Sequence, residues 1–227
     1  MNVLVIAAHP DDEVLGCGGT MARLAANGDR VDVLILGEGI TSRSRNREEA
    51  HQDDIAELHN HARSANEGLG VTAVTLLSLP DNRFDSLPLL DVVKHIEDAI
   101  ARFEPEMIFT QHGGDLNFDH VITYRATLIA TRPMRETTVR RVLSYEVASS
   151  TEWAFQKFDP QFRPTVFYDI SGTLDLKLAA MQSYDTETRE FPHPRSPLAL
   201  TSIARRWGST VGVEAAEAFE LVREIIR

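Results

Sequence analysis

Apolar runs separated by amphipathic stretches are the first regularity along this chain. Residues 3–8 form a continuous apolar run, which is typical of a strand covered on both faces. Similar runs predict further strands at residues 31–36, 71–79, 107–110, 139–147 and 165–170. Each of the first strands is followed by a stretch that can form a helix, so the pattern predicts right-handed parallel strand–helix–strand units.

Amphipathic stretches predict the helices that connect these strands. Residues 89–103 carry apolar side chains at i, i+3 and i+4 spacing, and only Glu97 interrupts the stripe. Further helices are predicted at residues 18–27, 46–69, 120–130, 174–184 and 214–226. Residues 186–197 contain three prolines and are predicted to be a long loop. Together these elements predict an α/β fold with a mostly parallel sheet.

Bulk properties narrow the class of protein. The length of 227 residues fits one domain, residues 1–227, better than two. The formal net charge of −11 repels polyphosphate backbones, so we expect no nucleic acid among the partners. Cys17 is the single cysteine, which suits a reducing compartment. No apolar run approaches the roughly 18 residues of a membrane helix, and no basic stretch precedes the first run. We therefore expect a cytoplasmic protein without a membrane span.

A cluster of polar residues follows the first predicted strand directly. Residues 8–13 read Ala-His-Pro-Asp-Asp-Glu. His9 and Asp12 are three residues apart, so an imidazole nitrogen and a carboxylate oxygen can both reach a Zn²⁺ about 2.0–2.2 Å away. Pro10 restricts the backbone, so Asp11 and Asp12 can be held in different directions. Acidic residues also favour a helix N-terminus, but that alternative does not explain a histidine with three acids after a buried strand.

A second polar cluster follows the strand predicted at residues 107–110. It reads His-Gly-Gly-Asp-Leu-Asn-Phe-Asp-His over residues 112–120. A catalytic zinc takes three protein ligands and keeps one open position, and either His112 or His120 can supply the third. The alternative is a hydrogen-bonded loop in which Asp119 caps the next helix. Two strand ends that each deliver histidine and aspartate favour a metal site.

These motifs resemble those of the LmbE-like (PIG-L) zinc de-N-acetylases. The resemblance rests on residues 8–13, on Gly-Cys-Gly-Gly at residues 16–19 and on Asp119-His120. It covers nearly the whole chain, and residues 79–85, 113–120 and 192–196 are similar to a bacterial subgroup. The resemblance implies a Rossmann-like three-layer domain. It also implies hydrolysis of an N-acetyl (N-acyl) group on a small-molecule amino sugar or sugar conjugate.

The resemblance also implies a role for individual residues. His9, Asp12 and His120 match the ligands of one Zn²⁺ per chain, and another divalent metal could replace it. Asp11 matches the general base, which takes the proton as the metal-bound water attacks the amide. Asp119 would lie behind the metal ligands and contact one of them.

One position departs from the family pattern. The family often has a histidine three residues before its third ligand, where this chain has Asn117. An asparagine amide can donate a hydrogen bond to an oxyanion but cannot give up a proton. A titratable helper should then come from another segment. His193 is the first candidate, because Pro192 and Pro194 stiffen its loop, and His112 is the second.

Three residues are predicted to contact the substrate: Asp81, Arg83 and Asn117. Asp81 follows a predicted strand end, as both metal clusters do, so it should face the same crevice. The alternative for Asp81 is a structural role in a Pro-Asp-Asn turn.

Other signals leave alternatives open. The glycines of residues 16–19 do not form the G-x-G-x-x-G pattern of a dinucleotide site, and an acidic turn would repel a pyrophosphate. A module that binds a nucleotide or a glycan without amide hydrolysis is the alternative class of function. Arg43, Arg45 and Arg47 form either a solvated loop or a clamp for a substrate phosphate. The identity of the sugar, the native metal and a possible homo-oligomer stay open.

Overall fold

A seven-stranded sheet runs through the computed structural model, which describes residues 1–43, 52–135 and 137–226. Its strands are β1 (Asn2–Ala7), β2 (Arg30–Gly37), β3 (Ala73–Leu79), β4 (Met107–Gln111), β5 (Arg141–Tyr145), β6 (Val166–Asp169) and β7 (Ala216–Glu224). The order across the sheet is β3-β2-β1-β4-β5-β7-β6. The first five strands in this order are parallel, and β7 runs antiparallel to both β5 and β6.

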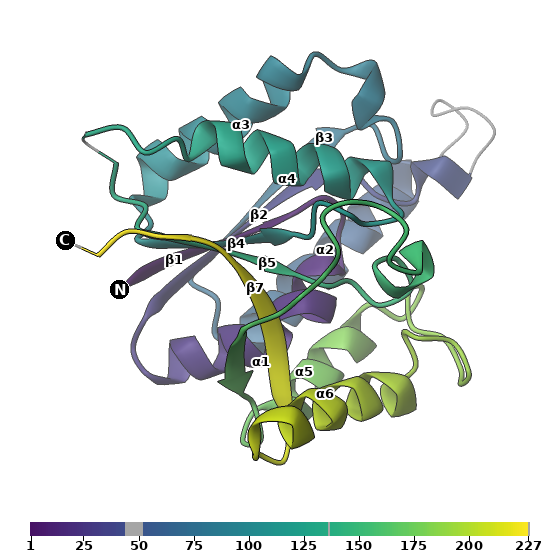
Figure 1. Cartoon of the computed structure of the whole chain (residues 1–227). Coiled ribbons are helices and arrows are strands. Elements are labelled where there is room, and N and C mark those ends of the chain that lie inside the picture. The colour runs from purple at the N-terminus through teal and green to yellow at the C-terminus, as the bar shows by residue number, and fades with distance from the viewer. Residues whose placement is uncertain (44–51, 136, 227) are drawn as a thin grey trace.

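Helices cover both faces of the sheet and make three layers (Figure 1). The helices are α1 (Asp12–Ala26), α2 (Gln52–Gly68), α3 (Leu89–Phe103), α4 (Phe118–Ala130), α5 (Leu174–Ser183) and α6 (Pro197–Val211). Helices α3 and α4 pack on one face, while α1, α2, α5 and α6 lie on the other. Short 3₁₀ turns occur at η1 (Thr41–Arg43), η3 (Phe84–Ser86) and η4 (Glu152–Ala154). The α/β, Rossmann-like fold predicted from the sequence is confirmed.

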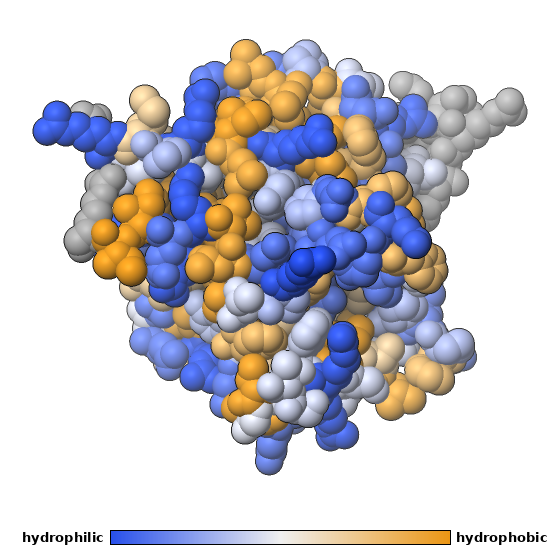
Figure 2. Space-filling model, viewed as in Figure 1, coloured by the Kyte–Doolittle hydropathy of each residue, from blue (hydrophilic) through white to orange (hydrophobic). Residues whose placement is uncertain are grey.

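The central strand β1 is buried on both faces, as its continuous apolar run predicts. Val3 and Val5 pack towards α1 and α2, whereas Leu4 and Ile6 pack towards α3 and α4. The surface is largely hydrophilic, and hydrophobic groups interrupt it at several places, including the right-hand edge in Figure 2. No helix in the described part combines the length and apolarity of a membrane span.

Two helices begin earlier than the sequence predicts. Helix α1 starts at Asp12 rather than at residue 18, because its glycines serve close packing instead of breaking the helix. A Cβ atom at Gly16 would lie 2.1 Å from Cδ2 of Tyr145. Helix α4 starts at Phe118, and its N-cap is Asn117 rather than Asp119.

The prediction for the C-terminal segment is wrong. Residues 214–226 were predicted to be a helix, yet residues 216–224 form strand β7. Its alanines and glutamates favour a helix locally, but the open edge of β5 pairs with this segment and overrides that preference. Helix α6 was not predicted, although Ser196 caps it, Pro197 opens it and Gly212 ends it in a left-handed conformation.

Two predictions fall partly or wholly outside the described residues. The helix expected at residues 46–69 is described from Gln52 onwards, so residues 46–51 lie outside. The side chains of the basic cluster Arg43, Arg45 and Arg47 also lie outside the described part of the chain.

Candidate active site

The carboxyl ends of the parallel strands meet at a pocket of about 170 Å³. Its wall takes residues from the turns after β1, β2, β3 and β5, and from the first residues of α1 and α4. In open α/β sheets this edge is where ligands bind. His9, Asp11, Asp12, Asp81, Asn117 and His120, which were predicted to act together, all line this pocket.

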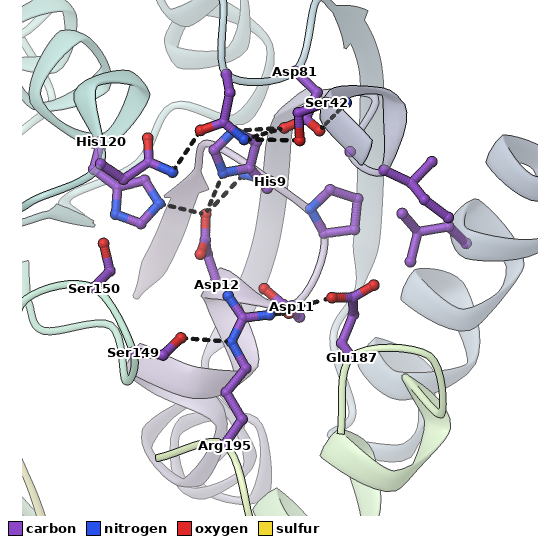
Figure 3. Close-up of a pocket in the computed structure, with 16 residues that line it drawn as sticks. His9, Asp11, Asp12, Ser42, Asp81, His120, Ser149, Ser150, Glu187 and Arg195 are labelled. Carbon is purple, nitrogen blue, oxygen red and sulfur yellow. Dashed lines mark hydrogen bonds and ion pairs between the residues drawn. The ribbon is translucent and has the colours of Figure 1, made fainter. Parts of the chain in front are cut away.

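A strained turn aims the two adjacent aspartates in different directions. Asp11 adopts a φ of 97°, in the left-handed region that non-glycine residues rarely occupy. It precedes the first residue of α1, and its carbonyl accepts hydrogen bonds from the N–H groups of Val14 and Leu15. The Asp12 carboxylate therefore points towards the histidines, while the Asp11 carboxylate points towards Arg195 (Figure 3).

His9, Asp12 and His120 converge on one point. The Asp12 Oδ2 atom lies 3.4 Å from His9 Nδ1 and 3.3 Å from His120 Nε2. One ligand atom from each residue lies within 4.8 Å of the others. Asp12 and His120 are buried, and His9 is nearly so. Two imidazoles and one carboxylate in this arrangement are the donor set of a divalent metal site.

The electrostatics of the trio favour a cation between its members. Burial opposes charge on Asp12, but His120 and His9 hold the pKa of its carboxyl well below the usual range. Burial also opposes charge on His120, but Asp12 and Asp115 raise its pKa to about 9. The carboxylates thus stabilise positive charge on the imidazoles, and a divalent ion would supply that charge directly.

Each histidine is oriented by a second carboxylate. His120 Nδ1 lies 3.2 Å from Oδ1 of Asp115, which is itself held by the hydroxyls of Ser150 and Thr151. His9 Nε2 lies 3.0 Å from Oδ2 of Asp119. Such pairs fix the ring orientation of metal-binding histidines. Asp119 thus contacts His9 from the side away from Asp12, as expected for a residue behind the metal ligands. The sequence analysis assigned no such role to Asp115.

A second trio shares His9 with the first. The His9 Nε2 side faces Asp81 and Asp119, and these three residues could also hold a metal ion. Carboxylates of both trios accept further hydrogen bonds, Asp81 from Asn82 Nδ2 and Asp12 from Gln111 Nε2, so these bonds do not distinguish the two arrangements. The second trio leaves out His120, so the first arrangement accounts for more of the cluster.

Arg195 reaches the pocket from the proline-rich loop and contacts Asp11. Its Nη1 atom lies 2.5 Å from Asp11 Oδ2 and 3.3 Å from Glu187 Oε2, and its Nε donates to Ser149 Oγ at 2.9 Å. Burial raises the pKa of the Asp11 carboxyl well above the usual range, and Arg195 opposes that effect. Sequence reasoning did not identify Glu187, and it noted Arg195 only as a positive charge beside the candidate His193, without assigning it to the site.

Three predicted residues do not reach the pocket wall. Arg83 is exposed and is not among the described residues that line the pocket. His112 is buried, with Nε2 2.7 Å from the Pro160 carbonyl oxygen and Nδ1 3.3 Å from Glu220, so it ties the loop after β4 to the loop after β5 and to strand β7. His193 accepts a hydrogen bond from Arg195 N at its Nδ1 and packs edge-on against Trp153. Its contacts support the turn that carries Arg195.

Asp81 and Asn117 line the pocket but also serve the structure around it. Asp81 is buried and fixes the turn through Ser42 and Asn82. The Asn117 Oδ1 atom accepts from Asp119 N, and its Nδ2 donates to Asn82 Oδ1 at 3.0 Å. Asp81 therefore stabilises the turn and also lines the pocket.

The chain is similar in sequence to known deacetylases. Residues 4–131 match the family model described as "GlcNAc-PI de-N-acetylase" (PIG-L). The uncharacterized deacetylase YaiS of Escherichia coli is 30% identical over 81% of this chain and 90% of its own length. The diacetylchitobiose deacetylase of Thermococcus kodakarensis is 26% identical over 97% of this chain and 83% of its own.

Similarity of fold extends further than similarity of reaction. The solved structure of GalB, a 4-carboxy-2-hydroxymuconate hydratase from Pseudomonas putida, superposes with a TM-score of 0.76. It covers 100% of this chain and 98% of its own, at 21% identity. At this identity the likeness concerns the fold alone, so the class of reaction follows from sequence membership. By that membership the chain belongs to the PIG-L family of metal-dependent de-N-acetylases, enzymes that hydrolyse an amide bond.

Proposed function

We propose that this chain is a zinc-dependent hydrolase that removes an N-acetyl or other N-acyl group from an amino-sugar substrate. The observation that carries the proposal is the buried His9–Asp12–His120 trio with the Asp11 carboxylate beside it. An amide is a weak electrophile, so its hydrolysis needs help both for the carbonyl and for the attacking water. The trio and Asp11 are suited to these two tasks.

His9, Asp12 and His120 would hold one metal ion per chain. Two imidazoles and one carboxylate suit zinc better than magnesium, which prefers oxygen ligands. When bound, the ion would polarise the amide carbonyl and lower the pKa of water towards about 7. Asp115 and Asp119 would keep the two imidazoles in the orientation and tautomer that a ligand needs.

Asp11 would be the general base. Its carboxylate would take a proton from the attacking water and deliver it to the nitrogen of the leaving amine. Arg195 would hold this carboxylate in position through the contact of 2.5 Å and favour its ionised form. Ser149 and Glu187 would in turn hold the guanidinium of Arg195.

The substrate would be an N-acetylated sugar or sugar conjugate. The name of the Thermococcus relative and the description of the family model both refer to such substrates. The pocket wall is also rich in groups that bond sugar hydroxyls, including Ser42, Asp81, Asn82 and Ser149. Arg195 is the one arginine or lysine among the described lining residues, and it is already paired with acids. This favours an uncharged sugar over a phosphorylated one.

Two further expectations accompany this proposal. We propose that residues 1–227 act as one domain, because all described strands join one sheet. We also propose a reducing, cytoplasmic location, because the single cysteine, Cys17, is a buried free thiol.

Acetate release from a panel of N-acetylated sugars tests the proposal. The purified protein should release acetate from at least one member. A chelator should abolish the release, and added zinc should restore it. No acetate from any member by metal-loaded protein would contradict the proposal and would favour another water-addition reaction on this fold.

A further inference from the structure

Exposed aromatic side chains are confined to three segments of the described chain. Phe118 is 58% exposed and Phe191 is 62% exposed. Trp153, Phe155 and Phe158 are 41%, 73% and 51% exposed. The other phenylalanines, tyrosines and tryptophan that the structure describes are buried or half-buried. Such a concentration is unusual, because solitary exposed apolar groups scatter over most protein surfaces.

Contacts join the three segments to one another. The rings of Trp153 and His193 meet edge-on with centroids 5.7 Å apart, which joins the loop after β5 to the proline-rich loop. A Cβ atom at Gly114 would lie 1.9 Å from the Pro160 carbonyl oxygen, so the loop after β4 touches the loop after β5. The loops that carry the exposed aromatic residues are therefore joined to one another, and they lie at the right-hand side of the view in Figure 1.

The same loops supply part of the pocket wall. Asn117 lines the pocket between two exposed residues, Leu116 and Phe118. Ser149 and Ser150 line it from the loop that carries Trp153, and Arg195 lines it from the loop that carries Phe191. We call the exposed set the collar. It consists of Leu116, Phe118, Trp153, Phe155, Phe158 and Phe191.

The pocket and the collar differ in chemistry. The pocket wall is polar and acidic, whereas four of the six collar residues are phenylalanines, which cannot hydrogen-bond. The pocket volume of about 170 Å³ is also below the roughly 300–1,000 Å³ of typical ligand sites. The pocket can therefore enclose only one end of a larger substrate, and the rest must lie on the loops around it.

We propose that the collar binds a neutral apolar group, alkyl or aryl, that is attached to the sugar whose N-acyl end enters the pocket. This inference rests on the proposed function and specifies its substrate class. The net charge of −11 and the carboxylates of the pocket disfavour an anionic carrier. The phenylalanines favour an apolar group over a second sugar ring, because they offer contact area without hydrogen bonds.

Kinetics with matched substrates test the collar. Hexyl N-acetylglucosaminide should be hydrolysed with a kcat/KM about tenfold or more above that of free N-acetylglucosamine, since buried methylenes each add affinity. The double variant Phe155→Ser, Phe191→Ser should lose most of this advantage. Its kcat/KM for free N-acetylglucosamine should stay within about twofold of the unmodified protein. Leu90→Ser is the matched control, because Leu90 is 60% exposed but lies on α3. This variant should leave kcat/KM unchanged for both substrates.

A binding measurement separates this inference from the proposed function. Trp153 and Trp207 are the two tryptophans, so Trp207→Phe leaves Trp153 as the fluorescent reporter. Hexyl glucoside, which has no N-acyl group, should change this fluorescence saturably, and glucose should not. The double serine variant should weaken the binding about fivefold or more. If hexyl glucoside binds in this way while no sugar is deacetylated, the collar is an apolar binding site and the proposed function is wrong.

Three results would overturn the inference. One is no saturable signal with hexyl glucoside together with no kinetic advantage of the hexyl substrate. Another is a stronger advantage for diacetylchitobiose than for the hexyl substrate, which would make the collar a platform for a second sugar. The third is a change of oligomeric state in the double serine variant, measured by light scattering, with unchanged preference for the hexyl substrate. The collar would then be a contact between copies of the chain.

Discussion

Asp12 is the residue around which the site is organised. One of its oxygens, Oδ2, faces both imidazoles and also accepts hydrogen bonds from the His9 backbone N–H and from Gln111 Nε2. A carboxylate oxygen with two N–H donors is fixed before any metal arrives. The neighbouring Asp11 shares neither partner, so adjacent residues can hold the two roles proposed above, metal binding at Asp12 and proton transfer at Asp11.

Two buried histidines, His112 after β4 and His120 in the first turn of α4, give a matched pair for testing the proposed metal ligands. His120→Ala removes a nitrogen from the trio and should reduce bound zinc to a trace. His112→Ala removes an equally buried ring that contacts Pro160 and should leave one zinc per folded chain. Elemental analysis of both folded variants checks this. Equal zinc in the two proteins would exclude His120 as a ligand.

Asp11 should be required for turnover and dispensable for metal binding. Asp11→Asn keeps the size of the side chain and an oxygen that can face Arg195, but it cannot accept a proton at neutral pH. The expected loss of kcat is about 10²–10⁴-fold, as for removal of a general base. Acetate release and zinc content are measured on the same sample. Loss of zinc in this variant would show that Asp11 is a ligand instead.

Sequence reasoning finds site residues where several chemical groups lie close together in the chain. His9, Asp11 and Asp12 lie within one turn after a buried strand, and they line one pocket. Arg195 lies 184 residues from Asp11 and meets it only in the fold. The prolines and the histidine of residues 192–194 indicate that this loop is functional. Hydrophobic periodicity, however, does not show which side chain of a loop points into a pocket. The sequence therefore predicts His193 as the site residue of this loop, whereas in the structure Arg195 lines the pocket.

At the scale of elements, local preference and tertiary pairing compete. Strand β1 was predicted because burial on both faces leaves an uninterrupted apolar run. Strand β7 was missed because it is half-exposed, and Ala216, Glu217 and Ala218 are ordinary helix formers. Its partners β5 and β6 are distant in sequence, so no local pattern reports the pairing.

Gly16 shows how an element boundary follows from packing rather than from propensity. The Tyr145 ring fills the space where a Cβ would be, and its hydroxyl is anchored on the Ile6 carbonyl at 2.8 Å. Gly16→Ala should therefore lower the free energy of unfolding by about 1–3 kcal/mol, the usual cost of overpacking. Gly68→Ala is the control, because a Cβ atom added at Gly68, the last residue of α2, would have no neighbouring atom within 4 Å. Urea unfolding should show an unchanged or higher stability for it, and equal losses in both would contradict this account.

At the scale of the whole molecule, the order of the strands brings the site together. Strands β1 and β4 are neighbours at the centre of the sheet, and β5 lies beside β4. The turn after β1 carries His9 and Asp12, the loop after β4 leads to His120, and the loop after β5 supplies the hydroxyls that hold Asp115. Sequence alone predicts the first two contributions, because each carries its own histidine. The third consists of serine and threonine, which give no distinctive signal.

A buried ion pair ties strand β7 to helix α1, whose first residue is Asp12. Lys177 on α5 donates from Nζ to the Leu15 carbonyl at 2.7 Å and to Glu217 Oε1 at 2.6 Å. Glu217 on β7 also accepts the N–H groups of Gly19 and Thr20 in α1. Three elements from opposite ends of the chain thus meet through two charged side chains that are both nearly inaccessible to water.

Removing one charge of this pair should destabilise the whole fold. Lys177→Met leaves the Glu217 carboxylate buried without its cation, and such a loss typically costs 3–5 kcal/mol. Lys177→Met combined with Glu217→Gln removes both charges, so the double variant should be more stable than Lys177→Met alone. Lys94→Met is the control, because the Lys94–Glu97 pair has the same distance of 2.6 Å but is exposed at Lys94, and it should cost less than about 1 kcal/mol. Urea unfolding of the four proteins gives the comparison. If Lys177→Met costs no more than Lys94→Met, the buried pair does not hold α1, α5 and β7 together, and apolar packing alone must do so.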